Sequence, residues 1–203
     1  MLKILVATKN KGKLHEIRAL LADLPVELHS PDQIGLDVEV TEDGRTYQEN
    51  ATKKALAFAK GVDRDSGYLI LADDSGLEVS ILNGQPGLYS ARYSKRPGAT
   101  DADRRAYLLE QLAPHHHPWA AQFRCVVVLL DPDRNLHISE GICPGEIIPQ
   151  ERGTNGFGYD PIFQVDGLGR TMAELTTEEK NVLSHRARAI LAIRPRLIKF
   201  INS

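Results

Sequence analysis

Two adjacent acids follow a short apolar run before the middle of the chain. Residues 68–72 (YLILA) have the pattern of a buried strand, and Asp73, Asp74, Ser75 and Gly76 come directly after it. Two neighbouring carboxylates cannot both face a core, so we expect one to turn toward a ligand while backbone donors hold the other. A carboxylate at the carboxyl end of a strand can bind Mg²⁺ together with substrate phosphates. The alternative is a turn or helix cap, which the same residue types favour.

A polar loop near the N-terminus has the composition of a phosphate site. Residues 8–13 (TKNKGK) lie between an apolar run at residues 3–7 and a helical pattern. Backbone N–H groups and the helix dipole favour an anion at such a junction, and three lysines, a hydroxyl and a glycine suit a polyphosphate. The Walker A pattern is absent. A solvated turn with surface lysines is the alternative interpretation.

Lys54 stands on the apolar side of a predicted helix. The helical wheel places it beside Ala51 and Phe58, with Asn50 nearby. A lysine in that position must extend to solvent or meet an anion. Lys54 is therefore a candidate phosphate ligand, and extension to solvent is the alternative.

A glycine-rich loop in the second half of the chain could bind a base. Residues 153–160 (GTNGFGYD) frame an aromatic side chain with glycines, which allow a ligand to approach the backbone closely. Phe157 offers a stacking face, and Asp160 could accept hydrogen bonds from ring nitrogens. A β-turn with one core aromatic is the alternative.

Cationic side chains gather where the last helix is predicted to begin. Lys180 precedes Ser184, a suitable N-cap that places His185 and Arg186 in the first turn. Cations there oppose the helix dipole unless an acceptor compensates them. Both side chains can donate to a carbonyl, such as the 6-keto group of a purine. Ordinary surface charge is the alternative.

The elements that must position these residues alternate between strands and helices. Apolar and alternating runs predict strands at residues 3–7, 26–28, 68–72, 123–130, 136–142 and 147–148. Helical periodicity and capping residues predict helices that begin near residues 13, 46 and 100, and a long last helix that reaches residue 201. The turn residues 131–135 predict a hairpin. We predict an α/β fold with a mixed β-sheet flanked by helices, one domain over residues 1–203, and two lobes around a cleft.

The composition is that of an ordinary globular protein. The 203 residues are 42% hydrophobic and 26% charged, and the net charge of −2 argues against a nucleic-acid-binding protein. Cys125 and Cys143 show no metal or disulfide spacing, which predicts two buried, reduced thiols. We see no signal-peptide pattern and no apolar run near the 20 residues or so of a membrane span, so we expect a cytoplasmic protein.

Six segments, in order, resemble the noncanonical purine nucleoside triphosphate pyrophosphatase family, also called the inosine/xanthosine triphosphate pyrophosphatases. The resemblance covers nearly the whole chain, and its order makes it specific. The segments are TKNKGK at 8–13, EDGRTYQENATKKA at 42–55, ADDSGL at 72–77, PGLYSARY at 86–93, GFGYDPIF at 156–163 and ELTTEEKNVLSHRARA at 174–189.

The resemblance implies a function, a cofactor and a set of site residues. It implies an elongated mixed α/β fold with a cleft between two lobes, usually a homodimer. It also implies Mg²⁺-dependent hydrolysis of inosine, deoxyinosine and xanthosine triphosphates between the α and β phosphates. Asp74 matches the general base and, with Glu42, the metal-binding acids, although Glu39 or Asp43 could replace Glu42. The positions that match substrate-binding residues are Thr8, Lys9, Asn10, Lys11, Gly12, Lys13, Lys54, Ser75, Phe157, Gly158, Tyr159, Asp160, Lys180, His185 and Arg186.

Two other functions remain open from the sequence. A nonhydrolytic nucleotide-binding regulator could use the same residues, although acids beside phosphates would then bring little benefit. A related pyrophosphatase that acts on modified pyrimidine nucleotides, as Maf-type enzymes do, is the second. Asn155 stands where the family more often has a glycine, which bears on the flexibility of the loop.

Overall fold

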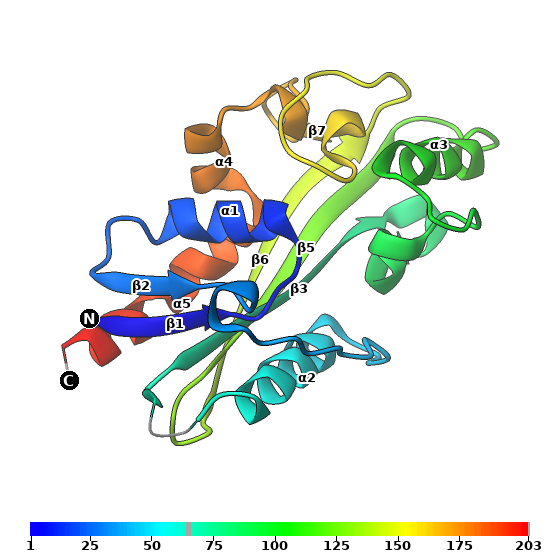
Figure 1. The fold of residues 1–203 in the computed structure, drawn as a ribbon. Helices are drawn as coiled ribbons and strands as arrows, with labels where there is room; N and C mark the ends of the chain where they lie inside the picture. The colour runs from blue at the N-terminus through cyan, green and yellow to red at the C-terminus, as the bar shows by residue number, and fades with distance from the viewer. Residues whose placement is uncertain (64–65, 203) are drawn as a thin grey trace. The chain divides into compact units, whose positions relative to one another are not determined.

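A computed structural model describes residues 1–63 and 66–202 of the chain (Figure 1). These residues form two compact units. Unit 1 comprises Met1–Asp74, Cys125–Gly141 and His185–Ser203, and unit 2 comprises Ser75–Arg124 and Ile142–Ser184. The prediction of a single domain with two lobes around a cleft stays a prediction.

The strands form one mixed sheet, which confirms the predicted fold class. Within the described residues it has seven strands, in the order β2-β1-β3-β5-β6-β7, with β4 paired to β3. β1 is parallel to β2 and β3, whereas β4 and β7 pair antiparallel to their neighbours. The bounds are β1 (Leu2–Val6), β2 (Val26–His29), β3 (Leu69–Val79), β4 (Gln85–Pro86), β5 (Trp119–Leu130), β6 (Leu136–Ile147) and β7 (Phe163–Val165).

The predicted helices are present with small shifts of their ends. Thr46 caps α2 by accepting a hydrogen bond from the Glu49 N–H, and α5 begins at His185 as expected. The α-helices are α1 (Lys11–Leu20), α2 (Tyr47–Lys60), α3 (Asp101–Leu112), α4 (Thr177–Leu183) and α5 (His185–Ile201). The short 3-10 helices are η1 (Asp32–Ile34), η3 (Ser80–Leu82), η4 (Gly87–Arg92), η5 (Asp160–Ile162) and η6 (Met172–Glu174).

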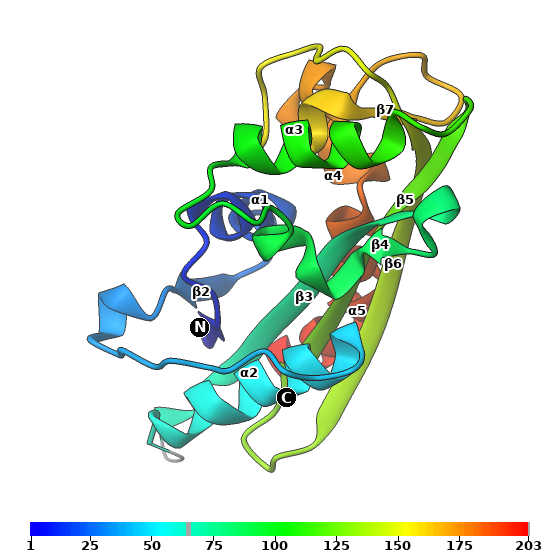
Figure 2. The ribbon, with the colours of Figure 1, turned by 90° about the vertical axis from the view of Figure 1, so that its right-hand side faces the viewer.

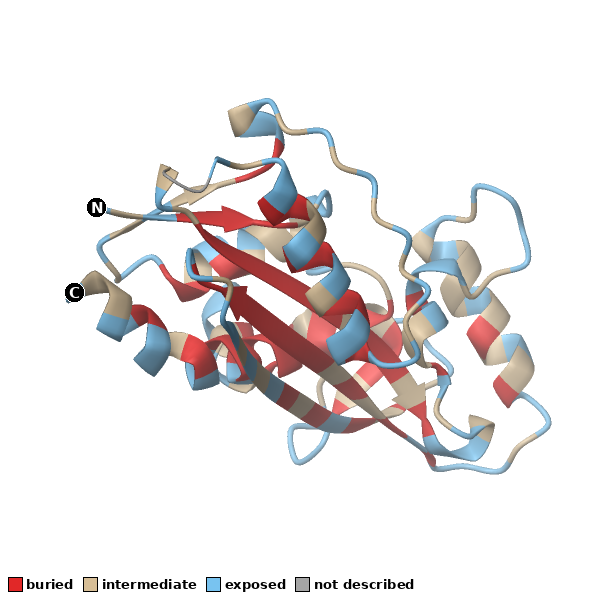
Figure 3. Ribbon diagram, turned by 90° about the horizontal axis from the view of Figure 1, so that it is seen from below, coloured by how far each residue is buried: buried red, intermediate tan, exposed pale blue. Residues whose placement is uncertain are grey.

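Unit 1 has three layers, because its strands are apolar on both faces. One face packs against α1 and α5 through Ile17, Ile190 and Leu197. The other face packs against α2 through Ala55 and Phe58. β1, β3 and β5 are largely buried, whereas β2 and much of β6 are more exposed; Figure 3 shows both kinds of strand. Side chains from both faces of these strands can therefore meet groups carried on helices.

Unit 2 has its own core. Leu108 and Leu112 of α3 pack with Phe123 of β5 and Phe163 of β7. Figure 2 shows α3, α4 and β7, the elements that surround this core. None of the helices in the described part of the chain combines the length and the hydrophobicity that a membrane span requires.

One local prediction is wrong. β3 does not end at Ala72 but continues through the two acids to Val79, because Leu77 and Val79 belong to the core of unit 2. Ser184 lies directly before α5 in an extended conformation, as an N-cap does, and it is also the C-cap of α4, with its N–H bonded to the Lys180 carbonyl.

Candidate active site

Asp73 and Asp74 extend to opposite faces of β3, because successive residues of a strand alternate sides. Both are buried, with 2% and 6% of their surface exposed. Asp73 meets side chains of α1 and α5, whereas Asp74 meets side chains of α2. The expectation that the two acids cannot both face the interior is therefore wrong. Buried cations make the placement of both acids possible.

Asp73 is paired with two cations on the α1 and α5 side. The Lys13 Nζ lies 3.0 Å and the Arg186 guanidinium 3.2 Å from its Oδ2. Arg186 is only 1% exposed and also contacts Glu16 of α1. Burial alone would raise the pKa of Asp73, but Lys13 and Arg186 outweigh burial and hold that pKa well below its usual range. Asp73 is thus a permanent anion that fixes Lys13.

The thiols of the chain take no part in this chemistry. Cys125 and Cys143 are both buried and free, as predicted. Burial and the neighbouring Asp73 raise the pKa of Cys125 to about 12. The thiol therefore stays protonated at neutral pH and is a poor nucleophile.

Asp74 is held by side chains of α2. Its Oδ2 accepts a hydrogen bond of 3.0 Å from the Asn50 Nδ2, and its Oδ1 lies 3.5 Å from the Lys54 Nζ. Asn50 is itself fixed, because its Oδ1 accepts from the Gly44 N–H at 2.7 Å. Burial raises the pKa of Asp74, although Lys54, Lys13 and Asn50 act against it. A buried carboxylate with a raised pKa is suited to accept a proton.

Lys54 joins Asp74 to a second acid. Its Nζ lies 3.3 Å from the Glu42 Oε2, so one ammonium serves both carboxylates. Burial would lower the pKa of Lys54, but Asp74, Asp73 and Glu42 raise it, and the side chain remains charged. The Lys54 side chain therefore meets anions and does not extend to solvent.

Two of the three acids at residues 39–43, Asp43 and Glu42, have different surroundings. Asp43 forms an exposed ion pair of 2.6 Å with Lys53, away from Asp74. Glu42 is the acid that shares Lys54 with Asp74. Two carboxylates around one cation fit a divalent ion, since Mg²⁺ binds one or two protein carboxylates together with phosphate oxygens. No group of three or more metal-ligating side chains occurs among the described residues.

The loop before α1 is ordered by its own side chains. Asn10 is the N-cap and accepts from the Lys13 N–H at 3.0 Å, while the Thr8 Oγ1 accepts from the Asn10 N–H. Lys9 pairs with Asp37 at 2.7 Å in an exposed position. Lys13 is thus the lysine of this loop that reaches the buried acids.

The predicted base-binding loop lies in unit 2 and is built around a buried ion pair. The Lys180 Nζ lies 2.9 Å from the Asp160 Oδ2, and that oxygen also accepts from the Phe157 N–H at 3.2 Å. Gly156 has a φ of +81°, and a Cβ there would fall 2.0 Å from the same oxygen. Only glycine fits this position. Lys180 also lies 6.0 Å from the centre of the Phe157 ring.

Two residues of the same region have structural contacts. Tyr159 is buried in the core of unit 2, where its hydroxyl donates to the Ser90 carbonyl at 2.9 Å, so its side chain is unsuited to contact a substrate. Asn155 donates from its Nδ2 to the Leu175 carbonyl, and its N–H bonds the Ala173 carbonyl. Asn155 therefore fastens the loop.

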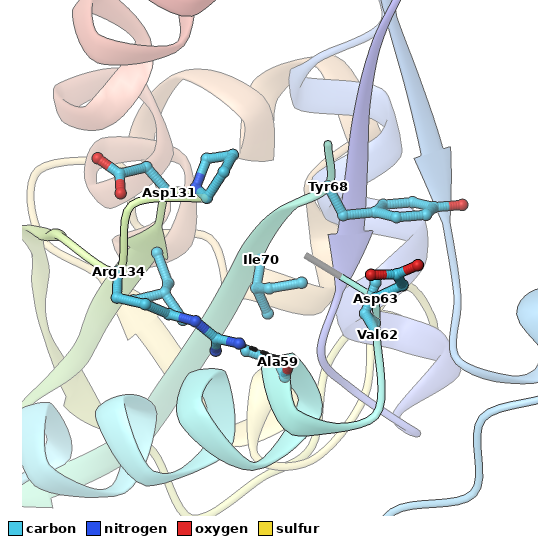
Figure 4. Close-up of a pocket in the computed structure, with 9 residues that line it drawn as sticks. Ala59, Val62, Asp63, Tyr68, Ile70, Asp131 and Arg134 are labelled. Atoms are coloured by element: carbon cyan, nitrogen blue, oxygen red, sulfur yellow. Dashed lines mark hydrogen bonds between the residues drawn. The ribbon is translucent and has the colours of Figure 1, made fainter. Parts of the chain in front are cut away.

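A small pocket of unit 1 lies apart from these acids (Figure 4). The Arg134 Nη2 donates to the Ala59 carbonyl at 3.1 Å across its rim. Its volume of about 20 Å³ suffices for roughly one water molecule, so it is too small for a substrate. The residues that line the pocket are Ala59, Val62, Asp63, Tyr68, Ile70, Leu130, Asp131, Pro132 and Arg134.

Comparison with known proteins gives the family. Residues 4–196 match the Ham1 family. The chain belongs to that family. A curated relative from Geobacter sulfurreducens, named dITP/XTP pyrophosphatase, is 44% identical over 97% of this chain and 97% of its own length.

Solved structures of Ham1 proteins have the same fold. A HAM1 protein from Coxiella burnetii is 39% identical and matches 98% of this chain and 100% of its own with a TM-score of 0.84. The nucleoside-triphosphatase / dITP/XTP pyrophosphatase from Mycobacterium abscessus is 42% identical over 96% of this chain and 100% of its own, with a TM-score of 0.73.

The structure sorts the residues that the Ham1 resemblance implies into two groups. In unit 1, Lys13 and Arg186 share the carboxylate of Asp73 on one face of β3, whereas Glu42 and Asp74 share the ammonium of Lys54 on the other face. Unit 2 brings together Phe157, Asp160 and Lys180, while Ser75, the first residue of unit 2, follows Asp74 along β3.

Three further residues of unit 1, Asp73, Asn50 and Glu16, are not among the positions that the resemblance implies. The sequence already sets Asp73 directly before Asp74 and Asn50 near Lys54, but sequence reasoning did not single out Glu16. Spacing carries a signal for Asn50 and Glu16. Asn50 precedes Lys54 by four residues on α2, and Glu16 follows Lys13 by three on α1, so each pair shares one helix face.

His185 makes the stability of the chain depend on pH. It is 8% exposed, and burial, with the nearby Arg186, lowers its pKa to about 3. The unfolded chain binds a proton at this histidine near pH 6.5, whereas the folded chain does not. The free energy of unfolding therefore decreases as the pH falls from about 6.5 toward 3.

In His185→Gln, the slope of the unfolding free energy against pH should decrease by up to about 1.4 kcal/mol per pH unit. Urea unfolding between pH 4.5 and 6.5 measures it, with the exposed His116→Gln as the control. Equal slopes in the wild type and His185→Gln would contradict the assignment.

Proposed function

We propose that this protein hydrolyses the noncanonical purine nucleoside triphosphates ITP, dITP and XTP to the monophosphate and pyrophosphate. Membership of the Ham1 family and relatives named dITP/XTP pyrophosphatase support this function. The observation that carries it is the arrangement of the buried Asp74, Asn50 and Lys54 with the partly exposed Glu42. It joins a carboxylate of raised pKa to cationic groups, as the hydrolysis of a phosphoanhydride requires.

The proposed cofactor is Mg²⁺, held by Glu42 and Asp74. Their carboxylates share one cation, the Lys54 ammonium, and this arrangement supports the placement of positive charge beside them. When bound there, the metal ion would supply charge neutralisation at the phosphates.

The remaining roles belong to side chains of the protein. Asp74 orients the attacking water and accepts its proton at a carboxylate oxygen, while Asn50 holds the carboxylate in place. Lys13 and Lys54 provide positive charge for the phosphates, and the loop at residues 8–13 offers backbone N–H groups at the start of α1. Little covalent chemistry is required of the protein.

Recognition of the base is proposed for the residues that the family resemblance implies. Phe157 stacks on the purine, and donors at His185 and Arg186 match a 6-keto oxygen but not the amino group of adenine. A mismatch between two donors can reject ATP by a factor of about 10⁴. In the structure, Arg186 donates to Asp73 and Glu16.

The ammonium of Lys54 gives a test of the metal site that does not depend on turnover. In Lys54→Met, Glu42 and Asp74 lose their shared cation, so we expect a lower Tm at pH 7.5 and a KM for ITP about tenfold higher. Added Mg²⁺ should recover part of the lost Tm, and the gain should exceed that of the wild type. Differential scanning calorimetry measures the Tm with and without Mg²⁺, and initial rates at varied ITP concentration measure the KM.

The neighbouring Lys53→Met is the matched control, because Lys53 pairs with Asp43 at the surface. It should leave the Tm and its Mg²⁺ response unchanged. Normal kinetics and an unchanged Tm in Lys54→Met would instead show that Lys54 is only a packed side chain.

A substrate panel separates the proposed function from its alternatives. Initial rates of pyrophosphate release are compared for ITP, dITP, XTP, ATP, the standard dNTPs and modified pyrimidine triphosphates, with and without Mg²⁺. We expect fast release from the first three alone, and only with Mg²⁺. Release from pyrimidines alone would favour a Maf-type activity, and binding without release would favour a regulator.

We further propose that the protein is a homodimer, as the family resemblance implies, and that it works in the cytoplasm. Light scattering coupled to gel filtration tests the first point. A mass of one chain, 22.5 kDa, at micromolar concentration would rule the homodimer out under those conditions.

A further inference from the structure

The base-binding loop of unit 2 is fastened at one residue by the start of α3. The Gly158 N–H donates to the Asp101 Oδ2 at 2.8 Å, and the Gly158 carbonyl accepts from the Arg105 Nη1 at 2.9 Å. Asp101 and Arg105 are four residues apart, so both lie on one face of the helix. The two polar groups of a single loop residue are thus bound by one turn of α3.

The two side chains are themselves fixed. Arg105 makes a bidentate ion pair with Glu151, with Nε–Oε1 and Nη2–Oε2 distances of 2.8 and 2.9 Å. The other oxygen of Asp101 contacts Arg104. Burial would raise the pKa of Asp101, but the Gly158 N–H and Arg104 together lower it, so the carboxylate is charged at neutral pH. Charged hydrogen bonds of fixed geometry are stronger and more directional than neutral ones.

Gly158 has a left-handed backbone conformation, with a φ of +63°, which glycine adopts without strain. Nothing lies within 4 Å of the position that a Cβ would take, so this side of the residue is open. The hydrogen bonds from its N–H and carbonyl to Asp101 and Arg105 fasten this residue to α3. Phe157 precedes it, and the Phe157 N–H is bound by Asp160. The backbone on both sides of the stacking ring is consequently held.

We propose that Asp101 and Arg105 are positioning residues for the nucleoside part of the substrate, through Gly158 and the Phe157 ring. The proposal rests on the proposed function, because it takes Phe157 as the stacking face. Neither residue touches the substrate. Their loss should let the ring leave its position and weaken binding of the base, while the phosphate-binding side chains of unit 1 stay as they are.

The first experiment follows the loop itself and needs no substrate. Hydrogen–deuterium exchange is measured for peptides that contain residues 156–160 in the wild type, Asp101→Ala and Arg105→Ala. We expect the Gly158 amide to exchange at least about tenfold faster in Asp101→Ala, since it loses a charged hydrogen bond. Exchange as slow as in the wild type would overturn the proposal. The matched control is Arg96→Ala, which removes an exposed ion pair with Asp103 at the same helix.

The second experiment separates the two parts of the substrate. Inhibition constants are measured for inosine, which carries the base, and for imidodiphosphate, which carries only phosphates. Both variants should raise the constant for inosine about tenfold and leave that for imidodiphosphate within twofold. Asp101→Asn, which keeps an acceptor oxygen, should restore most of the inosine binding. A parallel rise of both constants would show a general loss of structure and contradict the proposal.

The outcomes distinguish this inference from the proposed function. If the wild type neither binds inosine nor releases pyrophosphate from ITP, the proposed function is wrong, and exchange at Gly158 still decides whether α3 orders the loop. If the wild type is active and inosine binds the variants normally, the positioning role is wrong and the pyrophosphatase assignment stands.

Discussion

In Asp74→Asn, turnover of ITP should fall by about 100-fold or more at saturating Mg²⁺, while the chain remains folded. The amide keeps the shape of the side chain, and its oxygen can still accept from the Asn50 Nδ2. It cannot accept a proton from water, and it brings no charge to a metal ion. In the wild type, the rate should decline as the pH falls through the raised pKa of Asp74, since the carboxylate must be ionised to act as a base.

Asp43→Asn is the control for this prediction. It removes an acid one residue from Glu42, but one that pairs with Lys53 at the surface. Its kcat should stay within about threefold of the wild type, because exposed ion pairs contribute little. If Asp74→Asn kept more than about a tenth of the wild-type kcat, Asp74 would not be the general base.

The Arg186→Met variant should lose about 3–5 kcal/mol of unfolding free energy. Arg186 is buried between Asp73 and Glu16, so its removal leaves two acids without that cation in the interior. Urea unfolding at pH 7.5 measures the loss. Arg194→Met is a matched control on the same helix, because Arg194 also pairs with an aspartate, Asp23, but at the exposed side. The control should lose at most about 1 kcal/mol.

The family resemblance alone predicts a different result for Arg186→Met. If the guanidinium serves mainly to read the 6-keto oxygen, stability should stay within about 1 kcal/mol of the wild type, and the ratio of kcat/KM for ITP to that for ATP should collapse. If the buried network dominates, stability falls and the folded fraction keeps most of its preference for ITP. Activity measured on protein that remains folded separates the two.

Much of the fold could be predicted from local patterns. The apolar runs at residues 3–7 and 123–130, the hairpin turn and the capping residue Thr46 depend on neighbours in the sequence, and the structure has each of them. The extension of β3 through Asp73 and Asp74 could not be predicted in this way. Two adjacent acids favour the end of a strand unless cations pair with them. The cations that pair with Asp73 are Lys13 and Arg186, which lie far from it along the chain.

The site shows the same division between local and long-range information. Family resemblance gave Lys13, Lys54 and Asp74, but only the folded chain shows that Asp73 fixes Lys13. A buried arginine is rare, so ordinary surface charge stayed open as the alternative for Arg186, which the structure buries. The family resemblance places Tyr159 among the substrate-binding positions, yet its hydroxyl donates to the Ser90 carbonyl in the core of unit 2. Burial of these side chains is set by distant segments, which local patterns do not contain.

The most direct test of the account is the identity of the products formed from ITP. The enzyme is incubated with ITP and Mg²⁺, and the nucleotide and phosphate products are quantified together by ion-exchange chromatography. The account predicts IMP and pyrophosphate in a one-to-one ratio, and their loss in Asp74→Asn. Formation of IDP with inorganic phosphate, or no turnover of ITP at all, would contradict it.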